Sequence, residues 1–220
     1  MRKLACGVQL SLDGVMQAPG APQEDPTKGF RFGGWSVPYW DDAAMGQFMD
    51  SMFAVPYELL LGRKTYEIFE AYWPDHDDDP IGRAFNATRK YVATSSHAPL
   101  MWHNSVAIHD AAKDVARLKQ QDGPLLLTQG SAALLQTLLA SDLVDELQLF
   151  VFPLVLGKGK RLFGDGATPA ALKVVESKVS KTGVIMTRYQ RAGAVKTGSF
   201  MSEQPSPAES ARREKVKREG

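Results

Sequence analysis

The stretch Leu59-Leu60-Leu61-Gly62-Arg63-Lys64-Thr65-Tyr66-Glu67 sets the architecture of this chain. Its apolar first part predicts a buried strand that ends at Gly62, and the residues from Thr65 to Ala71 predict the helix that follows. Glycine at such a turn lets the backbone approach a phosphate, and free amides at a helix N-terminus favour an anion. The side chain of Arg63 or Lys64 can neutralise that anion.

Two further strands are expected to end in small or polar residues. The strand Lys90 to Ala93 leads into Thr94-Ser95-Ser96, whose hydroxyls can hydrogen-bond a ribose or its phosphate. The apolar Leu125 to Leu127 stops before Gln129-Gly130-Ser131-Ala132, where Ser131 is expected to cap a helix whose start can face a pyrophosphate. Taken singly, each of these segments is more often a turn than a site.

The rest of the chain supplies the other elements of an alternating α/β pattern. They are a strand from Leu4 to Leu10, a helix capped by Asp41 and Asp42 and running to Phe53, a strand from Val106 to Ile108, a helix from Ala111 to Gln121, a long apolar run from Leu147 to Val155, and a closing hairpin of Lys173 to Val179 with Val184 to Tyr189. This order predicts a three-layer α/β/α domain with a mixed, mostly parallel central sheet and an antiparallel C-terminal hairpin.

Composition favours small-molecule chemistry. The 220 residues are 44% hydrophobic and 23% charged with a net charge of +1, so neither nucleic acid nor an anionic membrane is an expected partner. A single cysteine, Cys6, excludes an intramolecular disulfide and suggests a buried thiol in a reducing compartment, which indicates a cytoplasmic protein. Since no apolar run reaches about 18 residues, no transmembrane helix is expected.

The domain is expected to span residues 1–192. The segment 193–220 becomes charged and almost free of apolar side chains towards its end, which predicts a disordered tail, with a partner-binding helix from Ala208 to Arg218 as the alternative. His76 and the three aspartates after it could suggest a metal site, but a solvated acidic loop explains them better, and no metal is predicted.

The order and spacing of the three strand ends resemble the dihydrofolate reductase superfamily, in which these strand ends hold NADPH. The resemblance covers Arg2 to about Gln190 and implies NADPH as cofactor. It assigns cofactor contacts to Gly62, Arg63, Lys64, Thr65, Thr94, Ser95, Ser96, Gln129, Gly130, Ser131 and Ala132.

Three other segments are similar to the branch typified by the riboflavin-pathway reductase domain. They are Ser11-Leu12-Asp13-Gly14, Asp145-Glu146-Leu147 and Pro153-Leu154-Val155-Leu156-Gly157-Lys158-Gly159. That branch reduces an aminouracil ribosyl phosphate with NADPH, and the resemblance places Gly157 and Gly159 beside the substrate. Gly46 stands near the point where true dihydrofolate reductases carry a carboxylate, so folate is not the expected substrate.

The hydride of such a cofactor would go to an electrophilic C=N or C=O carbon. The substrate then also needs one proton, whose transfer the protein must control. Asp13 is the catalytic candidate, as proton donor or substrate-orienting group, and a simple Asp13-Gly14 turn is the alternative. Trp40 and Asp41 are candidate substrate contacts. Trp40 can stack on a flat heterocycle or close the core instead.

These observations predict an NADPH-dependent reductase of a small heterocyclic or ribosyl substrate. The alternative is a catalytically inactive cofactor-binding or oligomeric interaction protein with the same fold. The resemblance further implies a homodimer that pairs through Leu147 to Val155, a run apolar on both faces. Its periodicity fits a central strand covered within one chain equally well.

Overall fold

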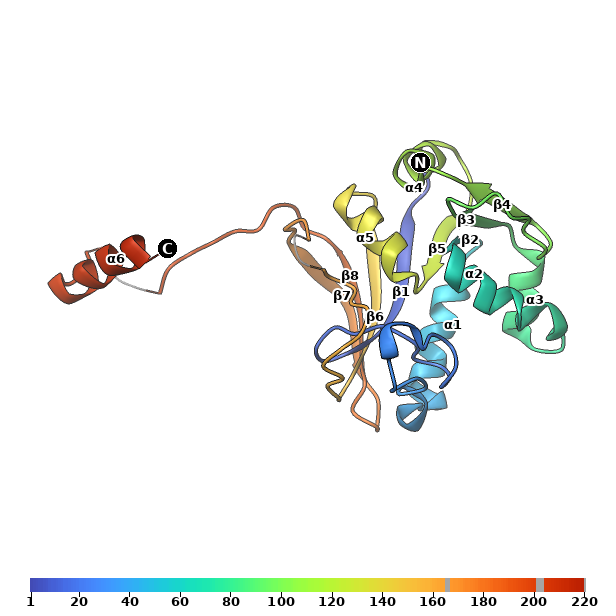
Figure 1. Cartoon of the computed structure of the whole chain (residues 1–220), viewed down its shortest axis with the longest axis horizontal. Helices are drawn as coiled ribbons and strands as arrows, with labels where there is room; N and C mark the ends of the chain where they lie inside the picture. The colour runs from blue at the N-terminus through green and yellow to red at the C-terminus, as the bar shows by residue number, and fades with distance from the viewer. Residues whose placement is uncertain (165–166, 201–203, 220) are drawn as a thin grey trace.

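The computed structural model describes residues 1–164, 167–200 and 204–219. Its centre is an eight-stranded sheet in the order β4-β3-β2-β5-β1-β6-β8-β7 (Figure 1). The strands are β1 (Leu4–Ser11), β2 (Tyr57–Gly62), β3 (Lys90–Ala93), β4 (Ser105–Ile108), β5 (Leu125–Gln129), β6 (Glu146–Phe152), β7 (Leu172–Val179) and β8 (Ile185–Arg191). Strands β1 to β6 pair in parallel and β8 pairs antiparallel with β6 and β7, which confirms the predicted mixed sheet.

Helices cover both faces of this sheet. They are α1 (Gln47–Phe53), which continues a short π-helix (Asp42–Gly46), α2 (Arg63–Glu70), α3 (Pro80–Ala87), α4 (Ala111–Gln120) and α5 (Ala132–Ala140). Buried side chains of α4 and α5 share one core cluster with β1, β5 and β6, whereas α1, α2 and α3 contribute to two clusters formed by other strand residues. The three-layer prediction is therefore confirmed.

The place of β2 in the sheet explains why the residues from Leu59 to Leu61 are all apolar. Leu60 packs in the cluster that includes α4 and α5, while Leu59 and Leu61 pack against α2 and α3. All three side chains are fully buried. A parallel strand covered on both faces needs apolar residues at every position, so the run from Leu59 to Leu61 follows from its central place in the sheet.

Strand β6 is internal, as the alternative of a central strand covered within one chain predicts. It lies between β1 and β8, and Leu147 and Leu149 pack on the α5 side of the sheet. Phe150 and Phe152 pack on the α1 side, and Phe150 is only 1% exposed. One chain thus covers both faces of this strand, since it supplies helices on either side of the sheet.

The long segment from Gln17 to Pro38 is held against the body rather than standing free. The Trp35 indole donates to the Gln17 carbonyl at 2.8 Å and packs edge-on against Phe152. The Gln17 side chain donates to the Asp25 and Thr27 carbonyls, which closes the loop on itself. Trp35 therefore belongs to the core.

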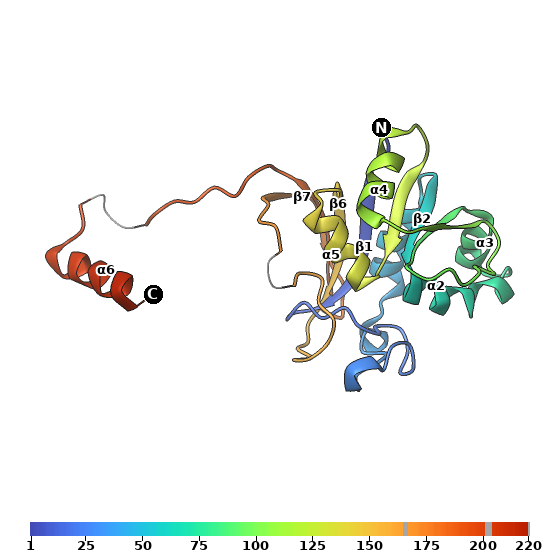
Figure 2. The same cartoon turned by 45° about the horizontal axis from the view of Figure 1, so that its top comes forward.

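The tail contains a helix, α6 (Pro207–Glu219), where the sequence predicted disorder. Figures 1 and 2 show it at the end of an extended segment that leads away from the sheet. Glu209 pairs with Arg212 and Arg213 at helical spacing, and such pairs stabilise a helix without burial. The structure thus differs from the predicted disorder at residues 207–219 and agrees with the helical alternative there.

The described residues contain neither a membrane-spanning helix nor a cluster of metal-binding side chains. No helix in ranges 1–164, 167–200 and 204–219 is both long and apolar enough to cross a membrane. Within the same ranges, no group of three or more histidine, cysteine, aspartate or glutamate side chains is placed to hold a metal ion.

Candidate functional site

The three predicted strand ends lie together at one edge of the sheet. Strands β3, β2 and β5 are neighbours and run in parallel, so Gly62, Thr94 and Gln129 all come at their carboxyl ends. In open parallel sheets this edge is where ligands bind. The structure therefore brings together segments that stand about 30 residues apart in sequence.

Ser131 joins two of these strand ends directly. Its hydroxyl accepts a hydrogen bond from the Gly62 amide at 2.9 Å and donates to the Thr65 hydroxyl at 2.8 Å. The predicted capping role of Ser131 is wrong, because its backbone lies in the left-handed region (φ 70°) and its side chain makes no cap bond to α5. The side chain instead reaches across to α2.

The starts of α2 and α5 consequently lie side by side. Among the described residues, no side chain caps either helix, and neither helix has an acidic residue in its first turn. Arg63 and Lys64 begin α2, and Ala132 begins α5 after Gly130, whose φ is 70°. Two uncapped helix N-termini with adjacent cations form an electropositive site suited to a pyrophosphate.

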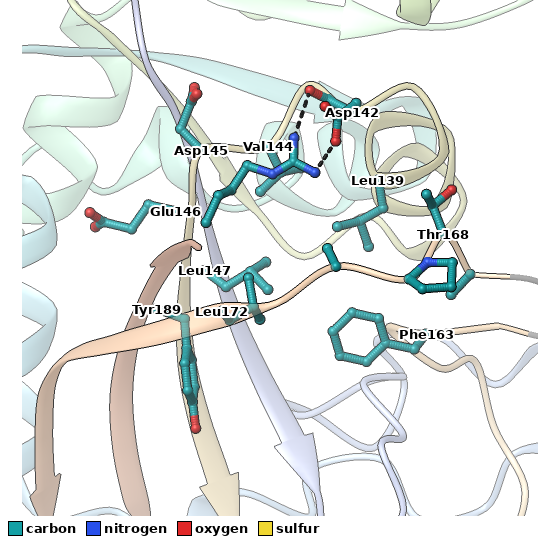
Figure 3. A pocket seen from close by; sticks show the side chains of 14 residues that line it. Leu139, Asp142, Val144, Asp145, Glu146, Leu147, Phe163, Thr168, Leu172 and Tyr189 are labelled. Carbon is teal, nitrogen blue, oxygen red and sulfur yellow. Dashed lines mark hydrogen bonds and ion pairs between the residues drawn. The ribbon is translucent and has the colours of Figure 1, made fainter. Parts of the chain in front are cut away.

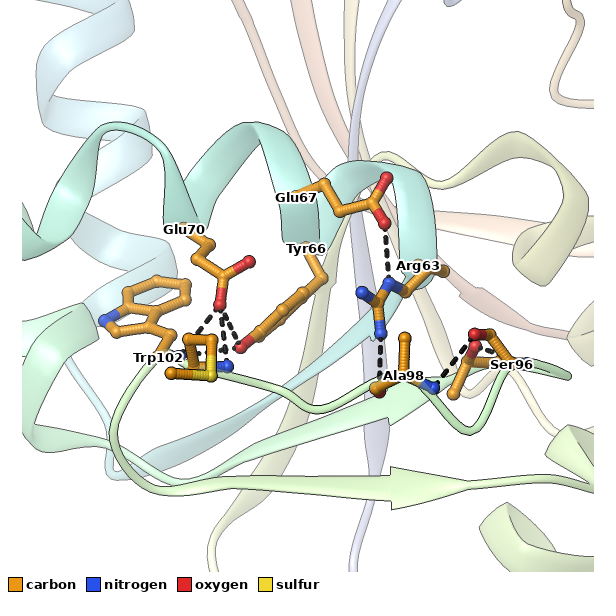
Figure 4. Close-up of polar contacts among 9 residues, drawn as sticks. Arg63, Tyr66, Glu67, Glu70, Ser96, Ala98 and Trp102 are labelled. Atoms are coloured by element: carbon orange, nitrogen blue, oxygen red, sulfur yellow. Dashed lines mark hydrogen bonds and ion pairs between the residues drawn. The ribbon is translucent and has the colours of Figure 1, made fainter.

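The segment after β3 forms a tight polar loop beside α2 (Figure 4). The Thr94 hydroxyl accepts from the Ser96 amide at 3.0 Å, and the Ser96 hydroxyl accepts from the Ala98 amide at 3.1 Å. The Arg63 guanidinium donates to the Ala98 carbonyl at 3.2 Å and pairs with Glu67. Ser95 and Ser96 are exposed, so their hydroxyls are accessible to a ligand.

A buried amide group marks the neighbouring part of the sheet. Gln129 lies against Gly7 of β1, and its Nε2 is buried without a hydrogen-bond partner among the described residues. The buried Oε1 of Gln9, two residues along β1, also has no partner in that part of the chain. Unsatisfied buried polar atoms are rare, and a ligand is one explanation for them. Gln9 was missed at the sequence level; its only signal is a polar residue inside an apolar strand.

Asp13 anchors a turn instead of facing an apolar pocket. Its carboxylate accepts from the Ser11 hydroxyl at 2.7 Å and from the Leu156 and Gly157 amides at 3.0 and 2.9 Å, and Arg161 lies 3.3 Å away. Burial alone would raise the pKa of Asp13, but these hydrogen bonds outweigh burial and lower it. A carboxyl group whose pKa is lowered is a poorer proton donor, so this geometry favours the orienting role of Asp13 or the simple turn.

The turn that Asp13 holds contains both predicted glycines. Gly157 has a φ of 77°, a conformation that favours glycine. Gly159 has a φ of 145°, and a Cβ there would lie 2.4 Å from Val15 and 3.2 Å from Phe30. Since this turn follows β6, Gly157 and Gly159 stand at the same carboxyl edge as the other strand ends.

Trp40 and Asp41 lie beside the β7–β8 turn. The Asp41 carboxylate caps the following helix through the Ala43 and Ala44 amides and accepts from the Lys181 amide at 3.1 Å. These backbone hydrogen bonds, led by that of Lys181, lower the pKa of Asp41. The Trp40 indole is partly exposed and donates to the Asp42 carboxylate. Asp41 thus has a structural role in this position.

A separate cavity of about 260 Å³ lies at the opposite edge of the sheet (Figure 3). It is formed where β6 begins, where β8 ends and where α5 ends, with Leu139, Leu147 and Tyr189 among its walls. The ion pair of Asp142 and Arg191 lies beside it. None of the predicted site residues lines this cavity.

The mixed sheet with helices on both faces is the fold of dihydrofolate reductase-like proteins. The chain belongs to the RibD C-terminal domain family, which matches residues 2–186. The resemblance seen in the sequence is thereby confirmed at the level of the family.

Known proteins similar to this chain agree with that assignment. The uncharacterized protein YyaP of Bacillus subtilis (strain 168) is 29% identical over 140 residues, which cover 61% of this chain and 74% of YyaP. Dihydrofolate reductase from Enterococcus faecalis, solved with NADP(H), matches with a TM-score of 0.55 and 13% identity over 86% of this chain and 96% of that one. A deaminase/5-amino-6-(5-phosphoribosylamino)uracil reductase from Thermotoga maritima matches with a TM-score of 0.55 and 17% identity, over 87% of this chain and 57% of that one.

Proposed function

We propose that this protein is an NADPH-dependent reductase of a small heterocyclic or ribosyl substrate, similar to the uracil reductase of riboflavin biosynthesis. The observation that carries the proposal is the Ser131 bridge, which sets two uncapped helix N-termini side by side at the carboxyl edge of the sheet. The names of the Enterococcus and Thermotoga proteins support the cofactor and the reaction class.

The residues present at this edge fit such a cofactor. The first turns of α2 and α5 would hold its pyrophosphate, with Gly130 allowing close approach. Arg63, Lys64 and Ser96 would hold the 2′-phosphate, since a cation and a hydroxyl are the groups that favour it. The Gln129 amide nitrogen, which has no hydrogen-bond partner in the described part of the chain, gives one further donor towards the same edge.

The chemistry that NADPH supplies when bound is a hydride at its nicotinamide ring. Asp13 contributes as a positioning residue, because its lowered pKa keeps it ionised and its carboxylate holds the Gly157 turn beside the end of β1. Gln9 lies two residues before Ser11 on β1, and its amide oxygen would accept a hydrogen bond from a substrate ring.

We also propose a homodimer, with its interface moved to the β7–β8 hairpin. The strand pairing puts Val174, Val179 and Ile185 on the same face of the sheet as Leu147 and Val151 of β6. The three hairpin side chains are exposed, unlike those of β6. An exposed apolar sheet face of this kind is typical of a protein–protein contact.

Titration calorimetry with NADPH and NADH, followed by turnover assays, tests the function. Charge-assisted contacts to the 2′-phosphate are worth roughly 1.5 to 3 kcal/mol, so NADPH is expected to bind more than tenfold more tightly than NADH. The Arg63→Ala variant is expected to reduce this difference in affinity. NADPH oxidation with an aminouracil, pteridine or carbonyl substrate supports the reductase. Binding without turnover across that panel supports the inactive binding protein, and equal affinities contradict the cofactor assignment.

A further inference from the structure

Glu70, on the last turn of α2, holds the far end of the polar loop that begins at Thr94. Its Oε1 accepts hydrogen bonds from the Met101 amide at 2.8 Å, the Trp102 amide at 2.9 Å and the Tyr66 hydroxyl at 2.8 Å (Figure 4). The Tyr66 oxygen also accepts from the Trp102 amide at 2.9 Å. One carboxylate oxygen therefore collects two backbone amides and a buried hydroxyl.

This arrangement is fixed by its surroundings. Tyr66 is fully buried and Trp102 is 4% exposed, and their rings lie 6.1 Å apart. The Trp102 indole donates to the Asn86 side chain at 2.7 Å, and the buried Lys90 ammonium stands 4.3 Å from the indole ring. The end of the loop consequently cannot shift without breaking several buried contacts.

The Glu70 carboxylate needs the hydrogen bonds that the loop amides donate to it. A carboxylate at the carboxyl end of a helix is disfavoured by the helix dipole, and Glu70 is only half-exposed. Hydrogen bonds from backbone amides to an ionised acceptor are among the stronger ones in proteins. The Met101 and Trp102 amides thus offset an otherwise unfavourable charge, which ties the loop to α2.

The same helix holds the near end of the loop. Arg63, seven residues before Glu70, donates to the Ala98 carbonyl, and the Ala98 amide donates to the Ser96 hydroxyl. Residues seven apart lie on one face of a helix, so a single face of α2 fixes the loop at Ala98 and again at Trp102. The position of the Ser96 hydroxyl depends on both attachments.

We infer that Glu70 is a positioning residue for cofactor choice, one that fixes the Ser96 loop in the shape that receives a 2′-phosphate. The inference rests on the proposed function. NADH has no 2′-phosphate, so a loosened loop should weaken NADPH binding and leave NADH binding almost unchanged. Because Glu70 contacts only Tyr66 and the end of the loop in the bonds described above, its effect must pass through the loop.

The test compares Glu70→Ala with Glu70→Gln in the full chain. The alanine variant is expected to raise the Kd for NADPH about tenfold and that for NADH less than twofold, by titration calorimetry. The glutamine variant keeps an oxygen that can accept from the amides and should recover most of the NADPH affinity. Tyr66→Phe removes only the bridging hydroxyl and should fall between the two.

A second readout needs no cofactor. In Glu70→Ala, amide hydrogen exchange of residues 96–102 should speed up while that of β1 and β6 stays the same. Met186→Ala, a buried substitution on β8 in a different core cluster, serves as the control for lowered stability and should leave the NADPH to NADH ratio unchanged.

The outcomes separate the two proposals. A wild-type protein that prefers NADPH, with a Glu70→Ala variant that keeps the same ratio or the same loop exchange, overturns the role of Glu70 alone. Equal loss of affinity for both cofactors in Glu70→Ala and Met186→Ala also overturns it, since this is what general destabilisation produces. A wild-type protein without preference for NADPH overturns the proposed cofactor and this inference with it.

Discussion

The carboxyl edge of β2 and β5 and the outer β7–β8 hairpin satisfy opposite physical requirements. At the edge, polar atoms of distant segments pair with one another, as Ser131 does with Gly62 and Thr65. On the hairpin, apolar side chains such as Val174 and Val179 remain exposed although strand pairing is complete along β8. The first region thus satisfies its polar groups within the chain and is the proposed anion site, whereas the second presents an apolar face that one chain leaves uncovered.

The difference lies in how far the helices extend across the sheet. Helix α5 packs on β6 through Leu134, Leu135 and Leu138, which share a cluster with Leu147 and Leu149. On β7 nearly every side chain is exposed. A strand at the centre of the sheet and a strand at its edge can therefore have similar residues with very different burial.

The strongest test of this comparison places a charge in the central strand β6 and another in the outer strand β7. Phe150→Asp buries a carboxylate between β6 and α1 and should abolish cooperative thermal unfolding, because an unpaired buried charge costs several kcal/mol. Val179→Asp, at a side chain that is 66% exposed, should keep its melting temperature and give a folded monomer. Melting curves with light scattering decide it, and a folded Phe150→Asp protein would refute the internal place of β6.

A smaller effect is expected from Ser131→Ala. The Gly62 amide then loses its acceptor, so the free energy of unfolding should fall by about 1 to 3 kcal/mol and NADPH binding should weaken. Ser131→Gly removes the same hydroxyl but relaxes the left-handed backbone, so it should cost less. If chemical denaturation shows that Ser131→Ala lowers the free energy of unfolding less than Ser131→Gly does, the left-handed backbone at Ser131 is not strained.

Asp13→Asn tests the anchored turn through pH. The pKa of Asp13 is lowered on folding, so its stabilisation is present above the ordinary carboxyl pKa near 3.8 and is lost as the pH falls through the lowered value. At pH 7 the variant should melt a few degrees lower than wild type, and the gap should shrink in strong acid. A gap that grows towards low pH would contradict the hydrogen bonds assigned to Asp13.

Removal of the tail after Ala192 should have the smallest effect. The fold of residues 1–192 is complete without α6, in which no residue is buried. The melting temperature and the NADPH affinity are both expected to stay within about 2 °C and twofold of the full chain. A clear drop in either quantity would show that the tail docks on the body.

The segments that the sequence predicts well are those in which local pattern and burial coincide. Leu59 to Thr65 forms the expected strand, turn and helix because both faces of β2 are covered. Ser131 was assigned a cap because a serine before an apolar helix usually has that role, and only the tertiary contact with Thr65 shows otherwise. Gln9 gave only the weak signal of a polar residue inside an apolar strand, since its environment comes from strands and helices far away in sequence.

The two aspartate candidates illustrate the same limit. A sequence shows that Asp13 precedes a glycine, but its protonation depends on amides at residues 156 and 157. Asp41 was correctly predicted as a helix cap, and the hydrogen bond from Lys181 joins it to a turn 140 residues later. Electrostatic roles are set by such long-range partners, which periodicity does not reveal.

Hydrogen exchange of the wild-type protein with and without saturating NADPH tests the central claim most directly. We expect NADPH to give new protection in residues 62–66, 94–98 and 129–134, which meet at the carboxyl edge of β3, β2 and β5. Residues around the cavity at the opposite edge should exchange as before. Protection confined to that cavity, or no protection anywhere, would contradict the placement of the cofactor at the strand ends.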